Sequence, residues 1–91
     1  MWAVVVRVEL NDGDASRKEL GRDVVPAVKQ APGFTQGIWA MHENRTSGTA
    51  LMVFEDEQKA RDAASTITVG TVSPAGTTTR EVGVYEVMAQ A

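Results

Sequence analysis

Three side chains have the chemistry that a catalytic site would need, and each is isolated in the sequence. His42 is the only histidine and could act as a general base, or it could be a solvated residue beside a turn. Arg7 lies among valines and could hold a substrate carboxylate or phenolate, or form an ion pair with Glu86 on a neighbouring strand. Tyr85, the only tyrosine, could donate a hydrogen bond to a ligand oxygen or to a backbone carbonyl. These residues are the catalytic candidates.

Four bulky apolar residues form the candidate ligand-binding set. Trp39 and Met41 alternate in one apolar segment, and Met52 and Phe54 alternate in the next. Side chains two positions apart on a strand share a face, so the four are predicted to lie together. They could line an apolar pocket for a flat ligand, or they could simply form the core.

Several common types of site lack the residues they require. The chain has no cysteine, so a disulfide, a thiol nucleophile, a zinc–thiolate site and an iron–sulfur cluster are excluded. A single histidine beside a turn does not provide a catalytic triad, and the acidic residues occur singly on the predicted elements. The glycines do not form a phosphate-binding loop. We therefore predict no haem, flavin or metal cofactor.

Composition and charge indicate one globular domain over residues 1–91. The net charge is −3 without a basic run, which argues against nucleic acid or an anionic membrane as the main partner. The apolar segment Met1–Val8 lacks a basic flank and is too short for a signal peptide or a membrane span. We expect the protein to stay in the cytoplasm.

A hairpin is the element that must position most of these side chains. Its predicted parts are a strand at Phe34–Glu43, a turn at Asn44–Ser47 and a strand at Gly48–Glu55. Phe34 is predicted to lie on the same face as Ile38. The predicted register pairs Glu43 with Gly48, Met41 with Ala50, Trp39 with Met52 and Gly37 with Phe54 on one face, and Ile38 with Val53 and Ala40 with Leu51 on the other.

The remaining elements complete a βαββαβ order, which is the ferredoxin-like plan. A four-stranded antiparallel sheet should carry both helices on one face, because the crossovers are right-handed. The first helix should kink or break at Gly21 and Pro26. The other predicted elements are a strand at Trp2–Leu10, a helix at Ala15–Gln30 capped by Asp12 or Asp14, a helix starting at Asp56 with a stripe of Ala60, Ala63, Ala64 and Ile67, a loop at Gly70–Thr79 and a strand at Arg80–Ala89.

Both faces of the predicted hairpin are apolar, which has a consequence for assembly. One layer of helices can cover only one face of the sheet. A second copy of the chain is the simplest cover for the other face. The sequence therefore predicts a homodimer formed through the sheet.

The order of elements resembles the dimeric α/β-barrel superfamily, and its closest branch is the antibiotic biosynthesis monooxygenase-like proteins. The similarity rests on the Ala31-Pro32-Gly33-Phe34 turn, Gly37 three residues on, and Phe54-Glu55-Asp56 before an alanine-rich helix. It implies a homodimer whose two sheets form one barrel, with a pocket between sheet and helices in each subunit. Some members oxidise aromatic polyketides without metal or flavin; others degrade haem, isomerise lactones or have no known activity.

Two departures from the family pattern bear on chemistry. Members often carry tryptophan at the end of the third strand, where this chain has Phe54. Haem-degrading members place a histidine on or just after the second helix, whereas residues 56–79 contain none here.

Two classes of function follow from the sequence. The first is a cofactor-independent enzyme, for example a monooxygenase, that acts on an apolar or aromatic small molecule. The second is a dimer that binds a small molecule or serves a structural role without catalysis. A deep pocket with a polar group facing its interior favours the first class, and a pocket filled by its own side chains favours the second.

Overall fold

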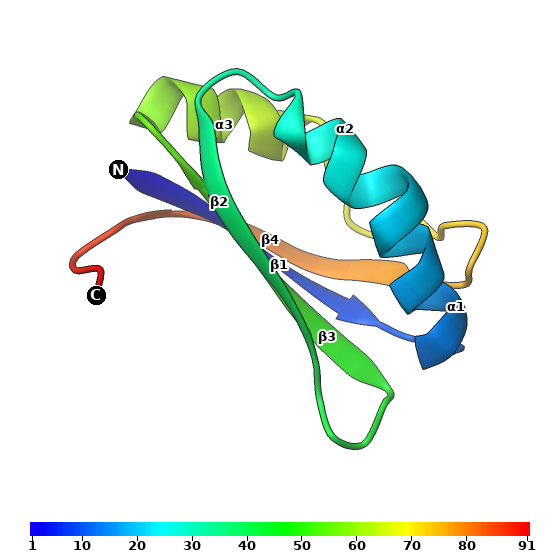
Figure 1. The fold of residues 1–91 in the computed structure, drawn as a ribbon. Helices are drawn as coiled ribbons and strands as arrows, with labels where there is room; N and C mark the ends of the chain where they lie inside the picture. Colours follow the sequence, from blue (N-terminus) through cyan, green and yellow to red (C-terminus); the bar gives the residue numbers. More distant parts are fainter.

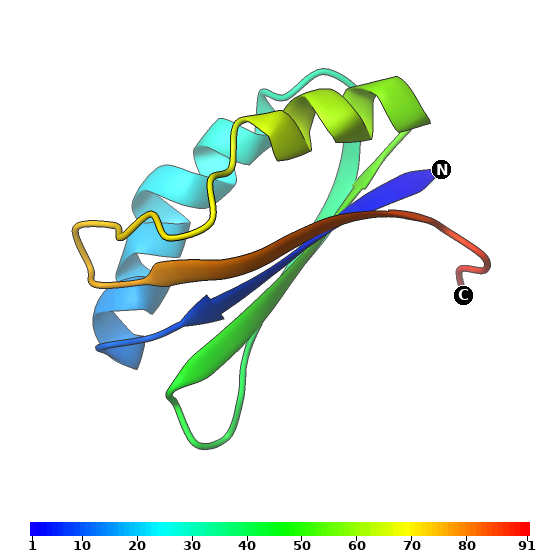
Figure 2. The same ribbon diagram turned by 180° about the vertical axis from the view of Figure 1, so that it is seen from behind.

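The chain folds as the predicted βαββαβ unit with one antiparallel sheet. The computed structural model describes all residues, Met1–Ala91. The sheet has the strand order β2-β3-β1-β4, and all helices lie on one of its faces (Figures 1 and 2). The strands are β1 (Trp2–Glu9), β2 (Phe34–Met41), β3 (Ser47–Phe54) and β4 (Thr78–Glu86).

The first helical segment is interrupted, as the sequence predicts. It consists of α1 (Gly13–Glu19), a π-helical turn η1 (Leu20–Val24) and α2 (Val25–Lys29). The Asp12 carboxylate caps α1 by accepting the N–H groups of Asp14 and Ala15, each at 3.1 Å. Pro26 has no N–H to donate, and the widened turn directly before it accommodates this loss.

The other helix, α3 (Glu57–Ser65), lies close to the sheet because its inner face is small. Asp56 caps it by accepting the Lys59 N–H at 2.9 Å. Ala60 is fully buried, and Ala63, Ala64 and Ile67 pack against the core, which confirms the predicted stripe. No helix in the chain has the length and apolar character needed to cross a membrane.

The hairpin register differs from the predicted one by two residues. Met41 pairs with Gly48, Trp39 with Ala50 and Ile38 with Leu51. The turn is therefore longer than predicted: β2 ends at Met41, and the His42 N–H bonds the Ser47 carbonyl at 2.9 Å. An even shift leaves each residue on its predicted face, because side chains alternate with a period of two.

Phe34 lies on the face opposite to the predicted one. The pairing of β2 with β3 is irregular between Phe34 and Gln36, and this local shift turns Phe34 toward the helices. Its ring meets Phe54 edge-on, with centroids 5.9 Å apart. Gly33 precedes it at φ +76°, a conformation that favours glycine, and lies against the Lys59 side chain.

The bounds of the last loop and the last strand also differ from the predicted ones. β4 begins at Thr78 rather than Arg80 and ends at Glu86 rather than Ala89. Part of the predicted loop folds back on itself: Val72 bridges Thr78, and the Ser73 N–H bonds the Thr77 carbonyl at 2.9 Å. The ends of this segment are thus held by backbone hydrogen bonds.

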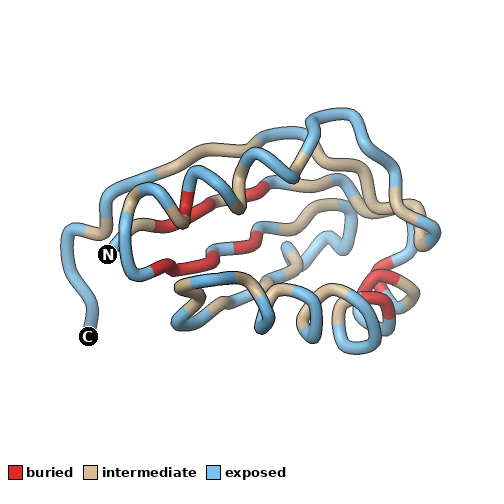
Figure 3. Tube along the Cα trace, turned by 90° about the horizontal axis from the view of Figure 1, so that it is seen from above, coloured by how far each residue is buried: buried red, intermediate tan, exposed pale blue.

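The core lies mainly between the sheet and α3. Buried residues concentrate on the central strands β1 and β3, with Ala60 from α3 and a separate buried patch in α1 (Figure 3). The opposite face of the sheet carries no helix, and Ile38, Leu51 and Tyr85 are exposed there. We call this surface the open face.

Candidate functional site

A cavity of about 760 Å³ lies between the first helical segment and the sheet. Its walls come from α1, η1 and α2 on one side and from β1, β2 and β3 on the other, and residues of α3 and of loop 70–79 complete the lining. Unlike Ala60 in α3, no residue of η1 or α2 is buried. We infer from this that η1 and α2 stand away from the sheet and leave the space open, whereas α1 has buried residues of its own.

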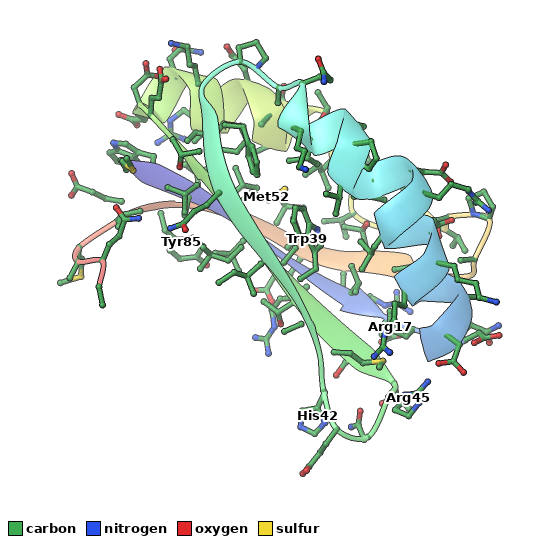
Figure 4. The ribbon with its side chains drawn as sticks, viewed as in Figure 1. Arg17, Trp39, His42, Arg45, Met52 and Tyr85 are labelled. Carbon is green, nitrogen blue, oxygen red and sulfur yellow. The ribbon has the colours of Figure 1, made fainter.

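The predicted ligand-binding set lines this cavity. Trp39, Met41, Met52 and Phe54 all form part of its wall, and Figure 4 shows Trp39 and Met52 between the sheet and the helices. Whether they bind a ligand stays a prediction. Other apolar residues of the wall include Val6 and Val8 of β1, Leu20, Val24, Ala27 and Val28 of the first helical segment, and Ile67 after α3.

Gly37 sets the position of the Trp39 indole. A Cβ at position 37 would lie 2.7 Å from Cη2 of Trp39 and 3.3 Å from the Phe34 ring. Trp39 is two residues further along β2, on the same face, and its ring covers the glycine. The absence of a side chain at position 37 therefore lets the indole lie along the strand.

His42 lies outside the cavity. It is exposed at the end of the hairpin, where its Nδ1 accepts the N–H of Asn44 at 3.1 Å. Figure 4 shows it beyond the sheet, at the end of the hairpin away from Trp39 and Met52. The structure thus places His42 in the solvated setting that was the alternative to a general base.

Arg7 and Tyr85 also lie away from the cavity, on the open face. Arg7 is 3.8 Å from the Glu81 carboxylate, so its nearest ion-pair partner is Glu81 and not Glu86. Glu86 faces Trp2 at the far end of β1. Tyr85 is 54% exposed, and Figure 4 shows it on the opposite side of the sheet from Trp39. None of the three catalytic candidates lines the cavity.

A polar cluster that sequence reasoning missed lies at the loop end of the cavity. The Glu19 carboxylate accepts the Ser73 hydroxyl at 2.7 Å and the Ala75 N–H at 3.1 Å. Ser16 and Thr77 share a hydrogen bond of 2.6 Å between their hydroxyls. Ser16 and Glu19 are both buried, so these bonds satisfy polar groups that water does not reach.

The sequence contained a signal for this cluster. Leu20, Val24 and Val28 recur every four residues in the first helical segment and mark its apolar face. A step of four residues back from Leu20 reaches Ser16, and Glu19 lies three residues beyond Ser16 on the same face. Two polar residues on the buried face of a helix indicate partners on the element they face.

Four charged residues line the cavity: Arg17, Glu19, Lys59 and Asp62. Glu19 is bound to the loop, and the Asp62 carboxylate accepts the Gln58 amide at 2.8 Å. Lys59 is 3.4 Å from Asp56 and 3.5 Å from Glu55; the hydrogen bond and the charge of Asp56 raise the Lys59 pKa. Arg17 forms no ion pair.

No metal site is assembled from the side chains of the chain. His, Cys, Asp and Glu residues do not come together in any group of three or more that could hold a metal ion. The charged residues of the cavity wall are instead engaged with neighbouring side chains or with the loop, apart from Arg17.

Comparison of the sequence with models of known protein families and with characterised proteins found no match. The candidate site is therefore defined by its geometry alone.

Proposed function

We propose that this protein binds an apolar, aromatic small molecule in the cavity between its first helical segment and its sheet. The observation that carries the proposal is the open space of about 760 Å³. This volume is within the roughly 300–1,000 Å³ of known small-molecule sites. Large apolar side chains line it from both layers, yet they do not fill it.

An unfilled cavity argues against a purely structural role. Protein interiors are normally close-packed, and an opening lined by the half-buried side chains of Trp39, Val24 and Val28 leaves unmade the packing that they could form across it. A flat aromatic ligand would restore those contacts. Methionine and aromatic rings suit such a ligand because they offer polarisable surfaces without demanding hydrogen bonds.

Cofactor-independent oxidation is the second candidate, favoured by the polar cluster beside the apolar wall. In that reaction a base removes a proton from an activated CH₂ group of an aromatic substrate. The carbanion then reacts with O₂, and the CH₂ becomes a carbonyl while the other oxygen atom leaves as water. Glu19 is the only carboxylate in the cluster, and both its oxygens already accept hydrogen bonds from the loop. This arrangement supports binding better than proton transfer.

The proposal includes a homodimer with a barrel formed by two sheets, as in the dimeric α/β-barrel superfamily that the sequence resembles. Its support is the open face, where Ile38, Leu51 and Tyr85 are exposed without any covering element. Location in the cytoplasm stays a prediction from the sequence.

Binding can be tested with 2-naphthamide, a neutral aromatic probe, followed by calorimetry and by tryptophan fluorescence. Saturable binding by the wild-type protein, weakened by Met52→Ala, is the expected result. Exposed Met88 lies outside the cavity wall, so Met88→Ala is the matched control and should bind as the wild type does. Absence of saturable binding would refute the proposal.

The enzymatic candidate has its own measurement. An anthrone, which has an activated CH₂ between two aromatic rings, is added to the protein in an oxygen electrode. Oxygen uptake that exceeds the uncatalysed rate and is lost in Glu19→Gln would favour oxidation over binding alone.

A further inference from the structure

We propose that the ligand of this cavity carries a carboxylate or phenolate, and that Arg17 binds this anionic group at the mouth of the cavity. This inference rests on the proposed function and deepens it, because it names the chemical class of the ligand. The apolar wall suits an aromatic ring system, whereas Arg17 suits a negatively charged group at one end of the ligand.

Arg17 is distinguished from every other arginine by its lack of a partner. The chain has six arginines, and Arg17 is the only one without an ion pair, although the protein has an excess of acidic residues. It is also the only arginine that lines the cavity. Each of the other five arginines forms an ion pair: Arg7 with Glu81, Arg22 with Asp23, Arg45 with Asp14, Arg61 with Glu57, and Arg80 with Glu9.

The position of α1 holds Arg17 beside the apolar wall. At the start of α1 the backbone comes close to β2: a Cβ at Gly13 would lie 2.7 Å from the Met41 sulfur. Arg17 is one helical turn beyond Gly13 on the same side of the helix. Figure 4 shows Arg17 between α1 and the sheet, on the hairpin side of Trp39.

The acidic groups around Arg17 are already engaged. Asp14, on the same helix, accepts Arg45 at 2.7 Å; that hydrogen bond is the main cause of its lowered pKa, and Arg17 contributes only a weak Coulombic attraction. Glu19 is bound to Ser73 and Ala75. The guanidinium of Arg17 therefore has its donors free for a ligand.

Arginine suits this role because of its geometry. Its planar guanidinium presents N–H donors in a fork that matches the two oxygens of a carboxylate. Lys59, the other cation on the wall, is bound by Glu55 and Asp56 and is less able to accept a further anion. Since Arg17 is partly in water, an anionic group on the ligand should increase the binding affinity by a moderate rather than a large factor.

Two probes of nearly the same shape test the inference. 2-Naphthoate carries a carboxylate where 2-naphthamide carries a neutral amide. The wild-type protein should bind the naphthoate about tenfold more tightly, as for a charge-assisted hydrogen bond. This preference should shrink at high salt, because the guanidinium is exposed enough to be screened.

Arg17→Gln should lower the affinity for naphthoate more than the affinity for the amide, so that the roughly tenfold preference for naphthoate is lost. Lys18→Gln is the matched control: it removes the same charge from the neighbouring residue, which is exposed, forms no ion pair and does not line the cavity. It should preserve the preference for naphthoate.

The outcomes separate this inference from the proposed function. Equal binding of the two probes by the wild-type protein would overturn the role of Arg17 and leave the cavity as a site for neutral aromatics. An equal loss of naphthoate binding in Arg17→Gln and Lys18→Gln would also overturn it, because the effect would then be one of net charge. Failure of both probes to bind would overturn the proposed function and the inference together.

Discussion

Two aromatic residues of the sheet lie over glycines two positions earlier in the same strand. Trp39 covers Gly37 on the cavity side, and Tyr85 covers Gly83 on the open face, where a Cβ at position 83 would lie 2.7 Å from the tyrosine ring. In both cases a missing side chain lets a ring lie along the strand instead of standing upright. The shapes of the cavity and of the open face thus depend on glycine as much as on the rings.

Gly37→Ala should disturb the cavity without unfolding the protein. The new methyl group must displace the Trp39 or Phe34 ring, which should cost about 1–2 kcal/mol of unfolding free energy and weaken binding of 2-naphthamide. Gly21→Ala is the control, because a Cβ at Gly21 meets nothing within 4 Å. Denaturant melts and probe titrations should show a loss of stability and of affinity in Gly37→Ala and no such loss in Gly21→Ala. Unchanged binding in Gly37→Ala would contradict the proposed role of Gly37 in shaping the cavity.

Trp39→Ala and His42→Ala should differ in stability because only one of them is packed. Trp39 is half-buried against the cavity, so its loss should cost about 2 kcal/mol, less than the 3–5 kcal/mol of a fully buried aromatic. His42 is exposed and should contribute within about 0.5 kcal/mol. Thermal or denaturant melts of both variants decide this. A large loss of stability in His42→Ala would show that the folded protein packs or binds the His42 side chain instead of leaving it in solvent.

At the scale of elements, Glu19 ties loop 70–79 to α1. Removal of its carboxylate in Glu19→Ala leaves the Ser73 hydroxyl and the Ala75 N–H without an acceptor, which should cost about 2 kcal/mol. Hydrogen exchange at the Ala75 amide should accelerate. Glu43→Ala, an exposed carboxylate without a bonded partner, should change neither quantity. An unaltered Ala75 amide would show that the loop is held by its own backbone bonds.

The cap of α3 should contribute to acid sensitivity. The pKa of Asp56 lies below its ordinary value of 3.8, chiefly because the Lys59 backbone N–H donates to it. Below that ordinary value the unfolded chain takes up the proton first, so stability is lost as the pH falls toward the lowered pKa. Melting temperatures should hold from about pH 7 to 5 and fall below about pH 4.

Asp56→Asn tests the origin of this effect, since asparagine caps a helix about as well as aspartate but does not titrate. The variant should match the wild type near neutral pH and lose less stability in acid. Some acid dependence should remain, because the pKa values of Glu9, Asp14 and Asp23 are lowered by their arginine partners. Identical acid profiles would exclude Asp56 as a contributor.

The sequence predicted the type and order of the elements better than their details. The alternation of a strand and the cap of a helix each depend on residues that are close in the sequence. The strands, the helix caps at Asp12 and Asp56, and the helix break near Pro26 could therefore be predicted. The hairpin register depends on the length of the turn, and a shift of two residues leaves the same faces apolar, so pattern could not detect the error. The bulge that turns Phe34 inward has no signal in alternation alone.

At the scale of the whole molecule, the site could be predicted only in part. The apolar wall was predictable because Trp39, Met41, Met52 and Phe54 share a face by alternation. The cavity itself depends on how far each helix stands from the sheet, which is a property of two layers together. The pairing of Glu19 with Ser73 joins residues 54 positions apart, and no local pattern specifies it.

The molecule has more surface than its mass requires, and the open face contributes to the excess. The accessible area of the molecule, 5908 Å², exceeds the roughly 5,200 Å² expected for a folded monomer of 9.8 kDa. Apolar side chains contribute to the excess, with Ile38 63% and Leu51 40% exposed and directly paired across β2 and β3. A second copy of the same face would remove this surface from water.

Light scattering at micromolar concentration should therefore give a mass of about 20 kDa, that of a two-fold dimer. Ile38→Glu combined with Leu51→Glu places two carboxylates where the sheets would meet, and burial of unpaired charge should shift the mass to the 9.8 kDa of the monomer. Val69→Glu, at a residue 58% exposed outside the sheet, should leave the dimer intact. A soluble wild-type monomer would refute both dimer and barrel, whereas a dimer that survives the double substitution would place the interface on another surface.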